Sequence, residues 1–168
     1  MSISMYAASV PVFTQMLNSL TDLLDKAETH ANDKKIDPNA LLQARLFPDM
    51  FALTRQVLIA ADFAKGSCAR LAGVDVPKYE DTEQTFAELK ARIAKTLAFI
   101  GSLPAAQIDG SEERDITTSS GPNSKSFKGQ TYLLHYSLPQ FFFHVTTAYA
   151  ILRHNGVDVG KRDFIGKY

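Results

Sequence analysis

Residues 139–152 read PQFFFHVTTAYAIL and form the most apolar helical segment of the chain. Pro139 suits the first position of a helix, and Asn155-Gly156 beyond Leu152 is typical of a helix end with a left-handed residue. A helix that carries apolar side chains around most of its circumference must pack against other helices. We therefore expect this segment to be the last helix of an all-α bundle.

The first two helices are predicted from apolar spacing and capping residues. In Ser9–Ala31 the apolar residues recur at spacings of three and four, which places them on one helical face. Asp37 and Pro38 are typical of an N-cap followed by proline in the first turn. A second long helix is expected to run from there to Gly73, with a bend or restart at Pro48.

A third helix and a hairpin are predicted before the last helix. Asp81 and Gln84 have the spacing of a capping box, and an apolar stripe follows them. Arg114–Thr118 and Ser126–Tyr132 flank a turn rich in Gly and Ser, so two short antiparallel strands are expected. The sequence thus predicts an up-and-down four-helix bundle with a short β-hairpin between helices 3 and 4, and an extended tail over residues 157–168.

The composition limits the possible classes of function. A length of 168 residues fits a single domain over residues 1–168. Because 18 Lys and Arg balance 18 Asp and Glu, no basic surface for nucleic acid is predicted. No apolar run reaches the roughly 18 residues of a membrane span. A single cysteine and the lack of an export signal favour a cytoplasmic location.

His144 is the strongest candidate for a functional side chain. It lies among the apolar residues 141–143 and Val145, so its ring is expected to be buried and to need a hydrogen-bond partner. Gln140 lies one turn earlier on the same helical face. The other interpretation is a core histidine that is hydrogen-bonded and has no further role.

Partners for His144 are predicted on the second helix. Arg45, Asp49 and Gln56 fall near one angle of the helical wheel. They form either a solvated face or a stripe in which Asp49 and Gln56 point inward at His144. In the second case Asp49, Gln56, Gln140 and His144 line one interior cavity.

The remaining candidates have simpler interpretations. His144 and His154 are ten residues apart, about 15 Å along a helix, which is too far to share a metal ion. His30 and His154 lie at helix ends, and His135 is expected to pack in a strand or loop. Cys68 is predicted to be a small buried thiol.

Three stretches carry a resemblance to a known family. They are MSISMY with VPVF near the start, RLFPDMFALTRQV with AADFAKG in the second helix, and FHVTTAYAILRHNGVDVGKRDFIG at the end. They resemble a bacterial domain family of unknown function in the DinB/YfiT-like superfamily. The resemblance implies a four-helix bundle, often dimeric, and for many members a metal centre or a thiol transferase activity.

The metal site of that superfamily is incomplete in this sequence. The superfamily takes one His from the second helix and an H-x-x-x-H pair from the last helix. Carried over through the RHNG motif, the pair falls on Ala150 and His154, and Ala150 cannot bind a metal. No histidine occurs between Leu41 and Leu134. The resemblance therefore implies a degenerate site, and we expect no metal and no other cofactor.

Three functions remain open from the sequence. The first is a bundle that binds a small polar ligand in an interior cavity. The second is a divalent-metal enzyme such as a thiol transferase, and the third is a structural dimer without a site. A homodimer is expected because Phe51, Leu58 and Ile59 lie off the main apolar stripe of the second helix.

Overall fold

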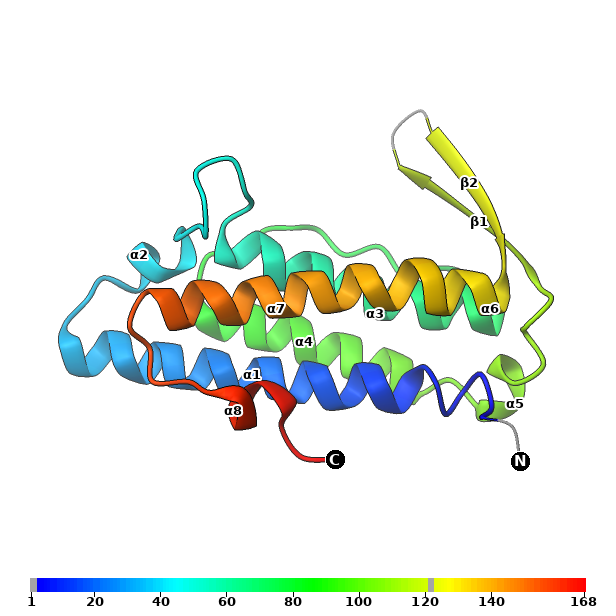
Figure 1. Ribbon diagram of the computed structural model, residues 1–168, viewed down its shortest axis with the longest axis horizontal. Helices are drawn as coiled ribbons and strands as arrows, with labels where there is room; N and C mark the ends of the chain where they lie inside the picture. Colours follow the sequence, from blue (N-terminus) through cyan, green and yellow to red (C-terminus); the bar gives the residue numbers. More distant parts are fainter. Residues whose placement is uncertain (1–2, 121–122) are drawn as a thin grey trace.

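The computed structural model describes residues 3–120 and 123–168. Its four long helices are α1 (Val10–Lys34), α3 (Leu53–Ala72), α4 (Phe86–Gly101) and α7 (Leu138–His154). They pack side by side as a bundle, and a two-stranded hairpin precedes the last of them (Figure 1). The predicted all-α four-helix bundle with a hairpin between its third and fourth helices is confirmed.

The predicted second long helix is interrupted. Asp37 caps the short helix α2 (Pro38–Leu42) by accepting a hydrogen bond from the amide of Asn39 at 3.0 Å. The chain then forms a loop over residues 43–52 before α3 begins. Pro48 explains the break, because it has no amide hydrogen to donate to an α-helix. The predicted helical stripe of Arg45, Asp49 and Gln56 is therefore wrong, since only Gln56 is on a helix.

The helix α4 begins with a different cap from the one predicted. Thr85 and Glu88 form the capping box: the Thr85 hydroxyl accepts from the Glu88 amide at 3.2 Å, and the Glu88 carboxylate accepts from the Thr85 amide at 3.0 Å. Asp81 lies outside this box and pairs with two arginines instead. The first helical residue is Phe86, which is buried.

The connection of residues 74–85 decides the direction of α4. It runs back along α3, so that Asp81 near its end meets Arg55 in the first turn of α3. Arg92 of α4 then lies opposite Asp62, at 3.9 Å between Nη1 and Oδ1. Consequently α3 and α4 run in the same direction (Figure 1), while α7 runs opposite to both, so the predicted up-and-down order of the four helices is wrong. Long connections of this kind are known in helical bundles.

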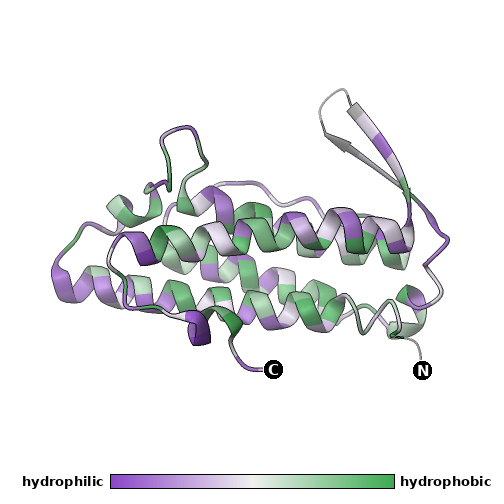
Figure 2. Cartoon of the chain, in the orientation of Figure 1, coloured by the Kyte–Doolittle hydropathy of each residue, from purple (hydrophilic) through white to green (hydrophobic). Residues whose placement is uncertain are grey.

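The core lies between the facing sides of the four long helices. Phe13 of α1 packs edge-on against Phe141 of α7, with ring centroids 4.8 Å apart, and both are fully buried. Figure 2 shows apolar and polar residues alternating along the helices, whereas the end of α1 nearest α2 is largely hydrophilic. This pattern is typical of helices with one buried face.

The hairpin is confirmed, but its second strand is shorter than predicted. After the short helix α5 (Ala105–Ile108), β1 (Asp115–Ser120) pairs with β2 (Asn123–Lys128), and the tip at residues 121–122 lies outside the described residues. The predicted strand as far as Tyr132 is wrong. Residues 129–131 form α6 (Gly129–Thr131), followed by the π-helical η1 (Tyr132–Ser137), so the last helical run starts well before Pro139.

The C-terminal tail packs against α1. It contains a short helix, α8 (Lys161–Ile165), where an extended segment was predicted. The Ser19 hydroxyl donates to the carbonyl of Asp163 at 2.6 Å, and Lys26 pairs with the Asp163 carboxylate at 2.8 Å. None of the described helices is both long enough and apolar enough to cross a membrane.

Candidate functional site

His144 and Gln56 meet between α7 and α3. Nδ1 of His144 lies 2.7 Å from Oε1 of Gln56, and the two residues are 7% and 1% exposed. The prediction that His144 is buried and bonded to a polar group of the second helix is confirmed. Nε2 of Gln56 donates to the carbonyl oxygen of Phe51 at 3.1 Å, which holds the amide in this orientation.

This hydrogen bond determines the tautomer of the imidazole. An amide oxygen only accepts, so Nδ1 of His144 carries the hydrogen and Nε2 carries a lone pair. Within the described residues Nε2 has no hydrogen-bond partner. Nor is this atom fully buried. Nε2 is therefore an accessible acceptor on an oriented ring.

The surroundings of His144 keep the ring neutral. Burial, and secondarily the positive charge of Arg55, lowers the pKa of His144 from 6.5 to about 4. At neutral pH the imidazole is therefore uncharged. It can accept a hydrogen bond or a proton at Nε2, but it does not act as a cation.

Aromatic rings surround the imidazole. Phe63 of α3 stacks against it with centroids 6.0 Å apart, and Phe143 packs edge-on at 5.2 Å. Phe63 also contacts Tyr136 of η1 at 6.1 Å. The rings of Tyr136, Phe63, His144 and Phe143 form a continuous row, which we call the aromatic row. It lies between the 43–52 loop and the hairpin.

Two of the four predicted site residues do not join the buried pair. Asp49 is exposed in the 43–52 loop, so the expectation that it points inward at His144 is wrong. Gln140 is also exposed, because it lies on the outer side of the first turn of α7. Gln140 instead lines a surface pocket of about 280 Å³ together with His135, Tyr136, Pro139 and Phe143.

The remaining candidate residues, His135, His154 and Cys68, do not belong to the site around His144. His135 belongs to η1 and is exposed, so its expected packing in a strand or loop is wrong. His154 is exposed at the end of α7. Cys68 is fully buried, and burial raises the pKa of its thiol to about 12, as expected of an unreactive core cysteine.

The donor set does not fit the metal centre that the resemblance implies. Over residues 3–120 and 123–168, no three His, Cys, Asp or Glu side chains come close enough to hold one ion. His144, the best-oriented histidine, has an amide as its neighbour instead of a second ligand. Three imidazoles, the usual donors for zinc or nickel, are not brought together here.

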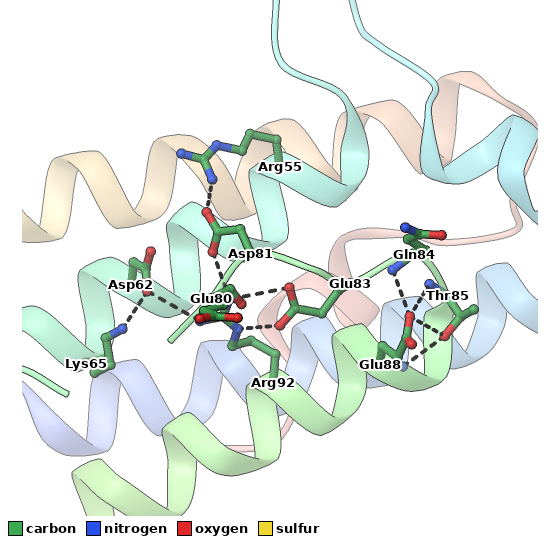
Figure 3. A network of polar contacts seen from close by, with 10 residues as sticks. All are labelled: Arg55, Asp62, Lys65, Glu80, Asp81, Glu83, Gln84, Thr85, Glu88 and Arg92. Atoms are coloured by element: carbon green, nitrogen blue, oxygen red, sulfur yellow. Dashed lines mark hydrogen bonds and ion pairs between the residues drawn. The ribbon is translucent and has the colours of Figure 1, made fainter. Parts of the chain in front are cut away.

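A second polar cluster surrounds Arg92, and all its close partners lie in one segment. Nε of Arg92 donates to Glu83 at 2.6 Å, and Nη2 donates to the carbonyl of Glu80 at 2.7 Å and to Asp81 at 2.8 Å. Figure 3 shows Arg92 at the centre of these contacts, with Arg55 on the far side of Asp81. Because Arg92 is 4% exposed and holds the 74–85 connection from within, this cluster is structural.

Two features of this region, the aromatic row and Arg70, were not predicted from the sequence. The row itself is split between α3, η1 and α7, so no single segment contains it. Arg70 lies on the same side of α3 as Phe63 and donates a hydrogen bond to Tyr132. Its neighbours in the sequence do not distinguish it from an ordinary surface arginine. Only the π-helical turn of η1, which sequence periodicity does not detect, brings these residues together.

The fold places the protein among four-helix bundles of the DinB type. A crystal structure described as a DinB family member protein from Shewanella denitrificans is similar to this chain, with a TM-score of 0.88 and 41% identity over 97% of this chain and 92% of that one. The family described as Domain of unknown function (DUF1993) matches residues 5–165, and the chain belongs to it. No match was found among curated proteins. The predicted family resemblance is confirmed.

Proposed function

We propose that the protein binds a small polar ligand that donates a hydrogen bond to Nε2 of His144. The observation that carries this proposal is the 2.7 Å hydrogen bond between Nδ1 of His144 and Gln56. It fixes the tautomer that leaves the lone pair on Nε2. The pKa of about 4 keeps this lone pair available at neutral pH.

The aromatic row supports a ligand with a flat apolar part. Binding sites for small molecules are mostly lined by apolar and aromatic side chains, with a few placed polar groups. Phe63 and Phe143 supply the apolar contacts beside His144. Gln140, one turn away, offers an exposed amide that lines the 280 Å³ pocket. The ligand would therefore bind on the face between α3 and α7 instead of in an interior cavity.

The alternative, a divalent-metal enzyme such as a thiol transferase, lacks a supporting observation. The only cysteine is buried and its thiol has a raised pKa. Among the described residues no three His, Cys, Asp or Glu side chains could hold one ion, and His144 is bonded to an amide. A polar ligand uses the groups that are present, namely one neutral imidazole and its aromatic neighbours.

Two matched probes test the proposal. p-Cresol carries a hydroxyl donor on a small ring, whereas 4-methylanisole has the same ring without the donor. We expect p-cresol to shift the NMR signal of the His144 imidazole in a saturable way. The affinity for 4-methylanisole should be at least tenfold lower, because it cannot donate to Nε2.

Two variants locate the binding. His144→Phe should abolish the saturable shifts that p-cresol causes at neighbouring residues such as Phe63. His154→Phe alters an exposed histidine at the end of α7 and should leave them unchanged. Equal affinity for the two probes, or p-cresol binding that survives in His144→Phe, would overturn the proposal. The comparison of probes on the wild-type protein does not depend on the folding of either variant.

A further inference from the structure

Arg70 is held in a fixed position near the C-terminal end of α3. Its Nη1 donates to the hydroxyl of Tyr132 in η1 at 3.1 Å. The side chain folds back over Gly66, one turn earlier, where a Cβ atom would lie only 2.6 Å from Nη1. Glycine at position 66 thus leaves room for the guanidinium, and Tyr132 orients it.

The charge of Arg70 is not balanced by a carboxylate of any described residue. Arg70 is half-buried, and the described part of the chain gives it no ion pair. Arg92, in contrast, is paired with both Asp81 and Glu83. Withdrawing a charge from water without a partner is costly. A guanidinium in this state has free donors whose planar arrangement suits a carboxylate.

Arg70 lines a small pocket between α3, η1 and the hairpin. The pocket has a volume of about 210 Å³ and is also lined by Ile59, Asp62, Phe63, Thr118, Tyr132 and Tyr136. Pockets for drug-sized ligands start at about 300 Å³, so this one suits a smaller molecule. Three aromatic rings give it apolar walls, and the Thr118 hydroxyl adds a polar group.

We propose that this pocket binds a small monocarboxylate with a flat apolar body. The carboxylate accepts hydrogen bonds from Arg70, and the body packs against Phe63 and Tyr136. Asp62 lines the same pocket, with one oxygen 2.8 Å from Lys65. Its negative charge disfavours a doubly charged phosphate more than a monoanion. Phe63 lines both this pocket and the His144 site, but Arg70 lies about 21 Å from Gln56 along the helix axis, so the group that binds the anion is distinct from His144.

Titration with benzoate, followed by NMR, tests this inference. Saturable shifts are expected at Phe63, Thr118 and Tyr132. Benzamide has the same shape without the charge, and its affinity should be at least tenfold lower. Benzoate that causes no saturable shift at these residues, or that binds no more tightly than benzamide, would overturn the inference.

Three variants identify the group that binds the anion. Arg70→Gln should lower the affinity for benzoate at least tenfold, whereas Arg153→Gln, an exposed arginine on α7, should leave it unchanged. Tyr132→Phe keeps the buried ring but removes the hydroxyl that orients Arg70, so a smaller loss is expected. Retention of full affinity in Arg70→Gln, or an equal loss in Arg153→Gln, would show that Arg70 is not the binding group.

Discussion

Nδ1 of His144 donates a hydrogen bond to Oε1 of Gln56 across 2.7 Å, and this bond joins two helices through residues that are 88 positions apart in the chain. Both side chains are buried, so each would lose a bond to water without gaining another if they did not meet. An apolar contact between helices tolerates small shifts in register. This pair fixes how α7 sits against α3 and excludes neighbouring registers.

The first prediction concerns the stability that this pair provides. His144→Ala should lower the free energy of unfolding by at least about 1 to 3 kcal/mol, because it leaves the buried oxygen of Gln56 without its donor. His30→Ala, near the polar end of α1, should change it by less than about 0.5 kcal/mol. Urea melts measure both. Equal, negligible effects would contradict the structural role of His144.

The second prediction is a loss of stability in acid. The pKa of His144 is about 4 in the folded protein, below its ordinary value of 6.5 in the unfolded chain. Between these values the unfolded chain binds a proton that the folded protein does not, so stability falls as the pH drops from about 6.5 to about 4. Above pH 6.5 the group is neutral in both states and contributes no pH dependence.

The contribution of His144 is isolated by comparing the wild type with His144→Phe. Up to about 3 kcal/mol of stability should be lost through this group between pH 7 and pH 4, and the variant should lack that part of the loss. Urea melts at several pH values give the difference. If wild type and variant lose stability in parallel, the pKa of His144 is not lowered by folding.

Helical periodicity predicted the four long helices because each buries one apolar face, which leaves a regular trace in the sequence. It failed where backbone geometry departs from that period. The chain leaves the helix at residues 43–52, and η1 widens to a π-helix at Tyr132–Ser137. The path of the 74–85 connection, which makes α4 parallel to α3, is held by the contacts of Arg92 with Glu80, Asp81 and Glu83, and local sequence does not reveal these contacts.

The same dependence on regular helices explains why only part of the candidate site was predicted. Gln56 and His144 both lie on regular helices, so their inward orientation follows from the wheel. Asp49 was placed inside only because the helix was assumed to continue through Pro48. Phe51, expected outside the apolar stripe, is exposed, whereas Leu58 is buried at 3% exposure and Ile59 is half-buried.

The third prediction concerns the role of Arg92 in holding the 74–85 connection. Arg92→Met keeps most of the side-chain volume but leaves Glu83, with 11% of its side chain exposed, without a partner. Removing one member of a buried ion pair is strongly destabilising, so a loss of about 3 kcal/mol is expected. Amide hydrogen exchange in residues 74–85 should become faster as well.

Lys90 provides the matched control for Arg92. It pairs with Asp25 at 2.6 Å and Glu28 at 2.8 Å, both on the outer side of α1. Exposed ion pairs contribute about 0 to 1 kcal/mol, so Lys90→Met should cost less than about 1 kcal/mol. A similar loss in both variants would mean that Arg92 acts no differently from a surface ion pair.

The 43–52 loop and α7 carry four exposed apolar residues, which we call the apolar patch. It consists of Leu46, Phe47, Phe51 and Phe143, which are between 41% and 63% exposed. Phe51 is tied to the His144–Gln56 pair through its carbonyl, and Phe143 packs against the imidazole ring. Apolar residues clustered in this way are typical of protein interfaces.

The fourth prediction is that the chain forms a homodimer through this patch. A two-fold axis at the patch would bring the phenylalanines of one copy onto those of the other, which removes both sets from water. Light scattering at micromolar concentration should then give twice the 18.5 kDa of one chain.

Phe47→Asp and Phe143→Asp should each shift the mass toward 18.5 kDa, since a carboxylate in an apolar contact loses its hydration. Val74→Asp changes an exposed apolar residue beyond the other end of α3 and should leave the dimer intact. A wild-type mass of 18.5 kDa would contradict the dimer, and a dimer that persists in both phenylalanine variants would place its interface on another face.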